Sequence, residues 1–192
     1  MSATAEQIAR YVLKLASEEP EAELVSHMRL QKLLYYVQGW SLAWRGEPAF
    51  PEEIQAWRHG PVVRGLYSKF ADYGRAAIDA DREKSDDTAL RPDLCAFVRS
   101  VWEHYKRYSA AELRRMTHQE PPYQEAWGDR PAEAKGSDPI RIEHIAAYFD
   151  KRRRETSDVV LSPAELSEAE AQFQSNAGRR LDDVIAAEGW SA

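Results

Sequence analysis

Cysteine is nearly absent from this sequence, because Cys95 is the only one among 192 residues. An intramolecular disulfide and a cysteine-rich zinc site are therefore excluded. Long apolar runs are absent too: the longest, Leu33 to Val37, is far shorter than the roughly 20 residues of a membrane helix. The first residues also lack the basic start and apolar stretch of a signal peptide. We therefore expect a soluble, cytoplasmic protein with no membrane partner.

Positive charge is not in excess, and aromatic rings are abundant. The chain has 32 acidic and 26 basic residues, which give a net charge of -6. A diffuse acidic balance argues against bulk attraction to nucleic acid. The six Trp and nine Tyr residues are more informative, because such large rings are either packed in a core or presented to a partner.

The sequence lacks the common catalytic and cofactor motifs. It contains no H-E-x-x-H helix, no glycine-rich phosphate loop and no G-x-S-x-G elbow. His118 and Glu120 match the H-x-E part of a zinc deaminase, but the P-C-x-x-C part is missing and Cys95 lies upstream. Cys95 has apolar neighbours on a predicted helix, which is typical of an inert core thiol. We therefore predict no metal, no cofactor and no enzymatic activity, and we expect His118 to cap backbone carbonyls.

Helical spacing dominates the sequence. Thr4 and Gln7 form a predicted capping box before the first helix. A second helix is expected from Ser26 to Arg45, with Gly46 as its C-terminal stop. This second helix is apolar nearly all round, which is typical of a helix buried on several sides. The sequence therefore predicts a mainly α fold, a compact multi-helix bundle around a buried central helix.

One short strand is expected near residues 53–58, where polar and apolar residues alternate. His59 and Gly60 end the strand, and Pro61 suits the first turn of a further helix that Gly74 closes. The remaining helices are expected to begin near Pro92, after Ser109 with its Glu112 capping partner, and before Ile142.

The chain divides near residue 155. Residues 1–155 form the predicted main domain, and residues 156–192 form a C-terminal helical arm with its own cap at Ser162–Glu165 and a thin apolar stripe. We expect this arm to dock weakly on the body or on a partner. The basic run Lys151–Arg154 could contact phosphate, but a run at a helix C-terminus more often complements the helix dipole.

Some aromatic residues are candidates for a partner surface. Trp40 and Trp44 share a helix face and are expected in the core. Trp57 precedes a Gly-Pro break, and its ring could either contact a partner or pack in the core. Trp127 follows a double proline, and the same two alternatives remain open for it. Trp, Tyr and Arg dominate interface hot spots. The candidate partner-binding residues are Trp57, Arg58, His59, Tyr67 and Trp127.

Three blocks of the sequence, in order, resemble one known family. Residues 28–40 (MRLQKLLYYVQGW) resemble the signature helix of the Panacea domain, the SocA-like antitoxin family. Residues 54–63 (IQAWRHGPVV) resemble its second signature. The third block runs from Trp102 through Ser109 to Pro122. The resemblance covers about residues 4–150.

The resemblance implies an antitoxin of a toxin–antitoxin system that neutralises a cognate toxin by direct protein binding. Such proteins are described as phage-associated and are not known as enzymes. One branch is linked to delivering its toxin to the ClpXP protease, so a proteolytic adaptor is an alternative. Many relatives carry a DNA-binding segment, which makes a transcriptional regulator another alternative, although no helix-turn-helix with a basic recognition helix is evident here. The net charge of -6 suggests a basic toxin.

Overall fold

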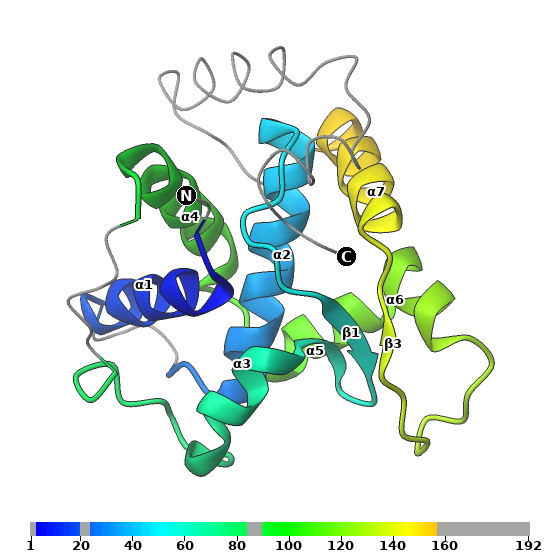
Figure 1. Ribbon diagram of the computed structural model, residues 1–192, viewed down its shortest axis with the longest axis horizontal. Coiled ribbons are helices and arrows are strands. Elements are labelled where there is room, and N and C mark those ends of the chain that lie inside the picture. Colours follow the sequence, from blue (N-terminus) through cyan, green and yellow to red (C-terminus); the bar gives the residue numbers. More distant parts are fainter. Residues whose placement is uncertain (1–2, 20–23, 84–89, 157–192) are drawn as a thin grey trace.

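The computed structural model describes residues 3–19, 24–83 and 90–156. Within these ranges the fold is mainly α, as predicted, with a small antiparallel sheet against one end of the central helix (Figure 1). The elements in chain order are α1 (Ala5–Ser17), α2 (His27–Arg45), β1 (Ile54–Trp57), β2 (Gly60–Val63), α3 (Arg64–Lys69), the 3-10 helix η1 (Ala71–Tyr73), α4 (Pro92–Tyr105), α5 (Ala110–His118), α6 (Pro121–Trp127), β3 (Asp138–Pro139) and α7 (Ile142–Glu155).

Helix α2 is the buried centre of the bundle, which confirms the prediction. It contacts α1, α4, α5, α7 and β2, so that nearly every one of its side chains is buried. Its N-cap is Ser26, whose hydroxyl accepts from the Arg29 backbone N–H, and its C-cap is Gly46 in the left-handed region at φ 67°. Both caps of α2 lie where the sequence predicted them, because capping depends on local backbone geometry.

Aromatic rings from α2, α4 and α7 fill the core. The Tyr36 ring stacks on Tyr105 at 4.0 Å, and the Trp40 indole N–H donates to the Tyr105 hydroxyl at 3.0 Å. Phe149 of α7 packs edge-on against Trp40. Gly39 makes this approach possible, because a Cβ there would lie 2.3 Å from the Phe149 ring. The expectation of a core position for Trp40 is confirmed.

The basic run on α7 is largely engaged within the fold. Arg152 pairs with the buried Glu120 carboxylate at 3.2 Å, and its guanidinium lies over the Trp40 ring. Arg153 and Arg154 both pair with Asp150. Arg152 therefore ties α7 to the body, and the other three basic residues of the run pair with carboxylates of α7 itself.

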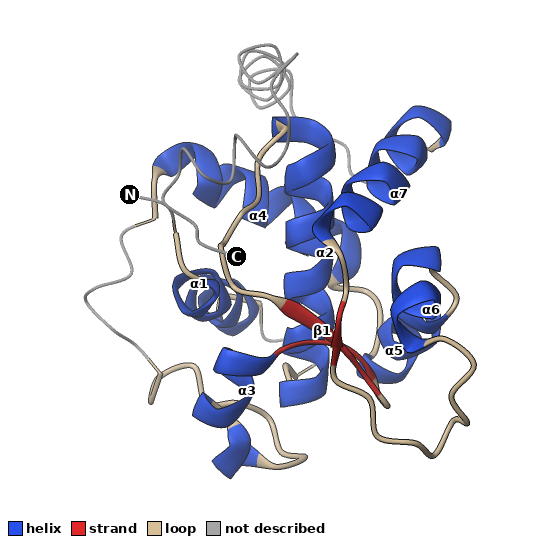
Figure 2. Ribbon diagram, turned by 45° about the vertical axis from the view of Figure 1, so that its right-hand side comes forward, coloured by secondary structure: helices blue, strands red, loops and turns tan. Residues whose placement is uncertain are grey.

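The sheet shows that the expected helix start at Pro61 was wrong. The predicted strand is β1, but Pro61 does not begin a helix; it lies in β2, which pairs antiparallel with β1 so that Ala56 faces Pro61 and Trp57 faces Gly60. Figure 2 shows the strands of this small sheet in red. The strand order is β2-β1-β3, and an edge strand tolerates proline because its missing N–H is not needed by a second neighbour. Strand β3, which pairs with the other edge of β1, was not predicted.

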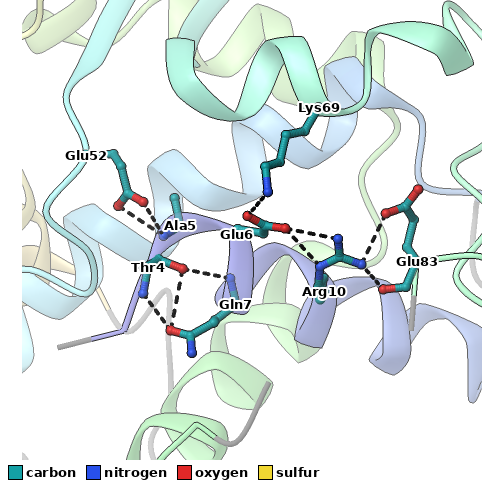
Figure 3. Close-up of polar contacts among 8 residues, drawn as sticks. All are labelled: Thr4, Ala5, Glu6, Gln7, Arg10, Glu52, Lys69 and Glu83. Atoms are coloured by element: carbon teal, nitrogen blue, oxygen red, sulfur yellow. Dashed lines mark hydrogen bonds and ion pairs between the residues drawn. The ribbon is translucent and has the colours of Figure 1, made fainter. Parts of the chain in front are cut away.

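The start of α1 is tied to two other elements, as Figure 3 shows. Thr4 and Gln7 form the predicted capping box. The Ala5 backbone N–H donates to the Glu52 carboxylate at 3.0 Å, just before β1. Glu6 bonds Lys69 at the end of α3 and Arg10 on its own helix. The ion pair between Glu6 and Lys69 joins α3 to α1, and α3 carries one of the candidate residues, Tyr67.

Residues 157–192, which include the predicted C-terminal arm, lie outside the described residues, so that arm stays a prediction. In the part of the chain that the structure describes, no helix is long and apolar enough to cross a bilayer.

Candidate functional site

A groove of about 770 Å³ opens at the N-terminal end of α2. Its lining comes from α2, the β1–β2 hairpin, the region of α3, and α5, and Figure 1 shows how these elements are arranged. We call it the hairpin groove. It is lined by Ser26, His27, Met28, Gln31 and Lys32 of the α2 end, Trp57, Arg58, His59 and Val62 of the hairpin, Tyr67, Gly74 and Arg75 around α3 and η1, and Ala111 and Arg114 of α5. Its volume falls within the range of pockets that bind small molecules or side chains of a partner.

Three rings from three elements form one wall of the groove. The Tyr67 ring lies 4.5 Å from the His27 ring and 4.8 Å from the Trp57 ring, measured between centroids. The Trp57 indole N–H donates to the Gln55 side-chain oxygen at 3.0 Å, which holds the indole in place. Tyr67 keeps 40% of its surface exposed, an unusual exposure for so large a ring on this molecule. The wall is therefore fixed in position and open to a partner.

The turn of the hairpin depends on Gly60. Its φ of 100° lies in a region that side chains rarely adopt, and a Cβ there would lie 2.7 Å from Lys32 Cε. The His118 Nε2 atom lies 3.1 Å from the Arg58 carbonyl oxygen, and the Tyr123 hydroxyl donates to the Trp57 carbonyl at 2.9 Å. Side chains of α5 and α6 thus contact the backbone of the turn and hold it in place. His118 contacts backbone carbonyls, as predicted.

Two polar residues of α2 hold the second strand of the hairpin. The Gln31 side-chain oxygen accepts from the Val63 backbone N–H at 2.8 Å, and the Lys32 ammonium donates to the Pro61 carbonyl at 2.8 Å. Lys32 is 1% exposed. Burial, and secondly the nearby Arg114 charge, lower the pKa of Lys32 to about 7. A lysine in this position is costly to keep charged, because burial disfavours the charged form.

The hairpin groove is electrically positive, although the chain as a whole is acidic. Its lining includes Lys32, Arg58, Arg75 and Arg114 and no Asp or Glu. Among the described residues, none of these four cations has a carboxylate within ion-pair distance. Burial and then the Arg114 charge lower the pKa of His59. The expectation of a basic toxin, drawn from net charge, therefore does not apply to this surface.

The structure brings four of the five candidate residues together. Trp57, Arg58, His59 and Tyr67 all line the hairpin groove. Trp127 lies elsewhere: it is 9% exposed, its ring stacks on Tyr123, and its indole N–H donates to the Arg130 carbonyl at 3.0 Å. The ring also covers Gly136, where a Cβ would lie 2.6 Å away. Trp127 thus packs the loop between α6 and β3, and it is not part of the groove.

Sequence reasoning missed the groove residues on the helices, namely His27, Gln31, Lys32 and Arg114. A signal was present for Lys32, because a lysine within a helix that is apolar all round must be buried with it. No group of three or more His, Cys, Asp or Glu residues that could hold a metal occurs in residues 3–19, 24–83 and 90–156. Burial raises the pKa of the Cys95 thiol, which keeps it protonated.

Residues 30–124 match the family model described as antitoxin SocA-like, Panacea domain. Over these residues, just under half of the chain, the sequence is similar to a SocA-like Panacea domain. The matched segment begins within α2 and ends within α6, so it contains the hairpin and most of the lining of the groove. No curated protein and no solved structure matches the chain. The family description supports a toxin–antitoxin role at the level of the family.

Proposed function

We propose that this Panacea-domain chain is an antitoxin that neutralises a cognate toxin by direct protein–protein binding, and that the hairpin groove is its contact surface. The observation that carries the proposal is the groove itself. It combines the exposed Tyr67 ring and the half-buried Trp57 ring with cations that have no carboxylate partner among the described residues, and most of its lining lies within the segment that matches the antitoxin family.

The composition of the groove suits a binding interface. Trp, Tyr and Arg are the residues that contribute most to interface hot spots. Trp57 and Tyr67 are already held in position by ring contacts, so little side-chain freedom is lost when a partner binds. The Gly60 turn and the Lys32 contact hold the backbone in the same way. A preorganised surface of this kind supports binding without any chemical step, so we propose no catalytic role.

The test is co-expression with the neighbouring gene. The wild-type chain should restore growth and co-purify with the product of that gene. Tyr67→Ala and Trp57→Ala should lose both properties while circular dichroism and melting temperature stay near wild type. Tyr11→Ala is the matched control, since Tyr11 is a half-buried tyrosine on α1 outside the groove. Absence of both rescue and complex for the wild-type chain would refute the antitoxin proposal.

The same strains address the adaptor alternative. A binder that acts by blocking its toxin should leave the toxin level unchanged when ClpXP is deleted. An adaptor would instead make toxin turnover depend on both this chain and the protease. Equal toxin half-lives in the presence and absence of ClpXP would exclude the adaptor.

A further inference from the structure

We infer that the hairpin groove contains an anion subsite, formed by Lys32 and Arg114, that receives the carboxylate of an acidic side chain of the partner toxin. The inference rests on the proposed function and adds the chemistry of the partner: a Glu or Asp at the centre of its contact surface, beside an apolar or aromatic group that packs on Tyr67 and Trp57.

Lys32 and Arg114 carry N–H donors that the described residues do not fully satisfy. The Lys32 ammonium has three N–H groups, and the Pro61 carbonyl is the acceptor that the described residues provide for it. The Arg114 Nε–H is buried and has no hydrogen-bond partner. Buried polar groups are nearly always satisfied in folded proteins, so the unpaired Arg114 Nε–H, beside a Lys32 ammonium with one acceptor, calls for an acceptor from outside.

Positive charge is not balanced by a carboxylate in the lining around the two side chains. Lys32 is fully buried, and Arg114 is close enough for its charge to disfavour the charged form of Lys32. Further cationic or titratable groups of the groove lie nearby: Arg58 and His59 on the turn and His27 on α2. Burial and the Arg114 charge favour the neutral amine of Lys32 in the free chain, whereas a carboxylate bonded to both side chains would favour the ammonium and accept from their N–H donors.

The arrangement of the cations favours a protein carboxylate over the phosphates of a nucleic acid. A nucleic acid needs an extended basic strip, but the chain carries a net charge of -6 and the basic run of α7 is engaged within the fold. The cations of the groove are instead concentrated in one hollow with an aromatic wall. That combination fits one acidic side chain with an apolar neighbour, which is the composition of a protein contact.

The experiment compares two adjacent arginines of α5 in the full-length chain. Arg114 lines the groove, whereas Arg115 is exposed and does not. Arg114→Glu should weaken the toxin complex by about a hundredfold, because removing one partner of a buried charge pair is far more disruptive than changing a rim charge. Arg115→Glu should change affinity by less than about threefold. Lys32→Gln, which removes the charge and keeps an N–H donor on a side chain one bond shorter, should also weaken the complex.

Two further measurements decide the source of the anion. A charge-reversing Lys substitution at one acidic residue of the toxin should restore binding to Arg114→Glu. Melting temperatures of the isolated chain in inorganic phosphate and in chloride, at equal ionic strength, provide the second arm. If phosphate alone stabilises the chain and no acidic residue of the toxin matters, the subsite takes a free anion and the inference is overturned. If Arg114→Glu binds and neutralises like wild type, the subsite is refuted while the antitoxin proposal stands.

Discussion

Lys32 offers the sharpest test of the structure that can be made on the isolated chain, without the toxin. Its side chain is 1% exposed, and its ammonium donates to the Pro61 carbonyl at 2.8 Å. Burial and the Arg114 charge lower its pKa from 10.5 to about 7. The test replaces Lys32 by Met, which keeps the aliphatic length of the side chain and removes the charge.

The sign follows from proton linkage. In the unfolded chain Lys32 keeps its proton up to a pH near 10.5, whereas in the folded chain it loses the proton above about pH 7. The unfolded state therefore binds more protons between these values, and the free energy of unfolding rises with pH. Integrated from pH 6 to pH 9, the shift in the pKa of Lys32 corresponds to a gain of about 3 kcal/mol at roughly 1.4 kcal/mol per pKa unit.

The assay is urea unfolding of wild type and Lys32→Met at pH 6, 7, 8 and 9. The wild-type free energy of unfolding should rise over this range by about 3 kcal/mol more than that of the variant. Other titrating groups are present in both proteins, so their contributions largely cancel. Lys151→Met is the control, because Lys151 is exposed on α7, and it should give a curve parallel to wild type. Parallel curves for Lys32→Met and wild type would refute the buried, charge-destabilised position of Lys32.

Three further substitutions test the scaffold of the groove and of the bundle by urea unfolding. Gly60→Ala should destabilise the fold by about 2–3 kcal/mol, because it combines a strained φ with a clash against Lys32; a change below about 0.5 kcal/mol would contradict the geometry of the turn. Glu120→Ala should cost about 3 kcal/mol, because it leaves Arg152 without its buried partner, and an unchanged midpoint would mean that the pair is not formed. Ser109→Ala should cost about 1 kcal/mol through loss of the α5 cap, whereas Ser109→Asp should retain most of the stability.

The helices could be predicted because their signals are local. The Thr4 capping box sets the start of α1, and the Ser109 capping box sets the start of α5, each through residues three positions apart. Pro92 begins α4, where its missing N–H would have no intrahelical acceptor in any case. The apolar character of α2 on all its faces was sufficient to place it at the centre.

The sheet was harder to predict because strand pairing is not local. Pro61 suits a first helical turn as well as an edge strand, and only its pairing with Ala56 decides between the two. Asp138 and Pro139 carry no strand pattern of their own; they are extended because they lie beside β1. A two-residue strand of this kind is defined by its neighbour and has no signature in sequence.

The sequence predicted the aromatic residues of the candidate site but not its residues on α2 and α5. Trp57 and Tyr67 stood out because large rings near a Gly-Pro break suggest presentation to a partner. Lys32 did not stand out, because it sits in a helix whose pattern indicates core. Arg114 could not be connected with them, since its position depends on the packing of α5 against α2. The positive charge of the hairpin groove therefore became evident only from the structure.

The hydrogen bonds from the buried polar residues of α2 have a consequence for how the domain can change over time. Gln31, Lys32 and Gln38 bond backbone atoms of Val63, Pro61, Ala49 and Phe50, and Arg29 bonds the Lys106 and Tyr108 carbonyls. A backbone atom is present whatever side chain its residue carries. The loops around α2 can therefore exchange their exposed side chains without losing their attachment to the helix. Such a scaffold can acquire a new binding specificity by surface substitution alone, while one constant helix keeps the loops in place.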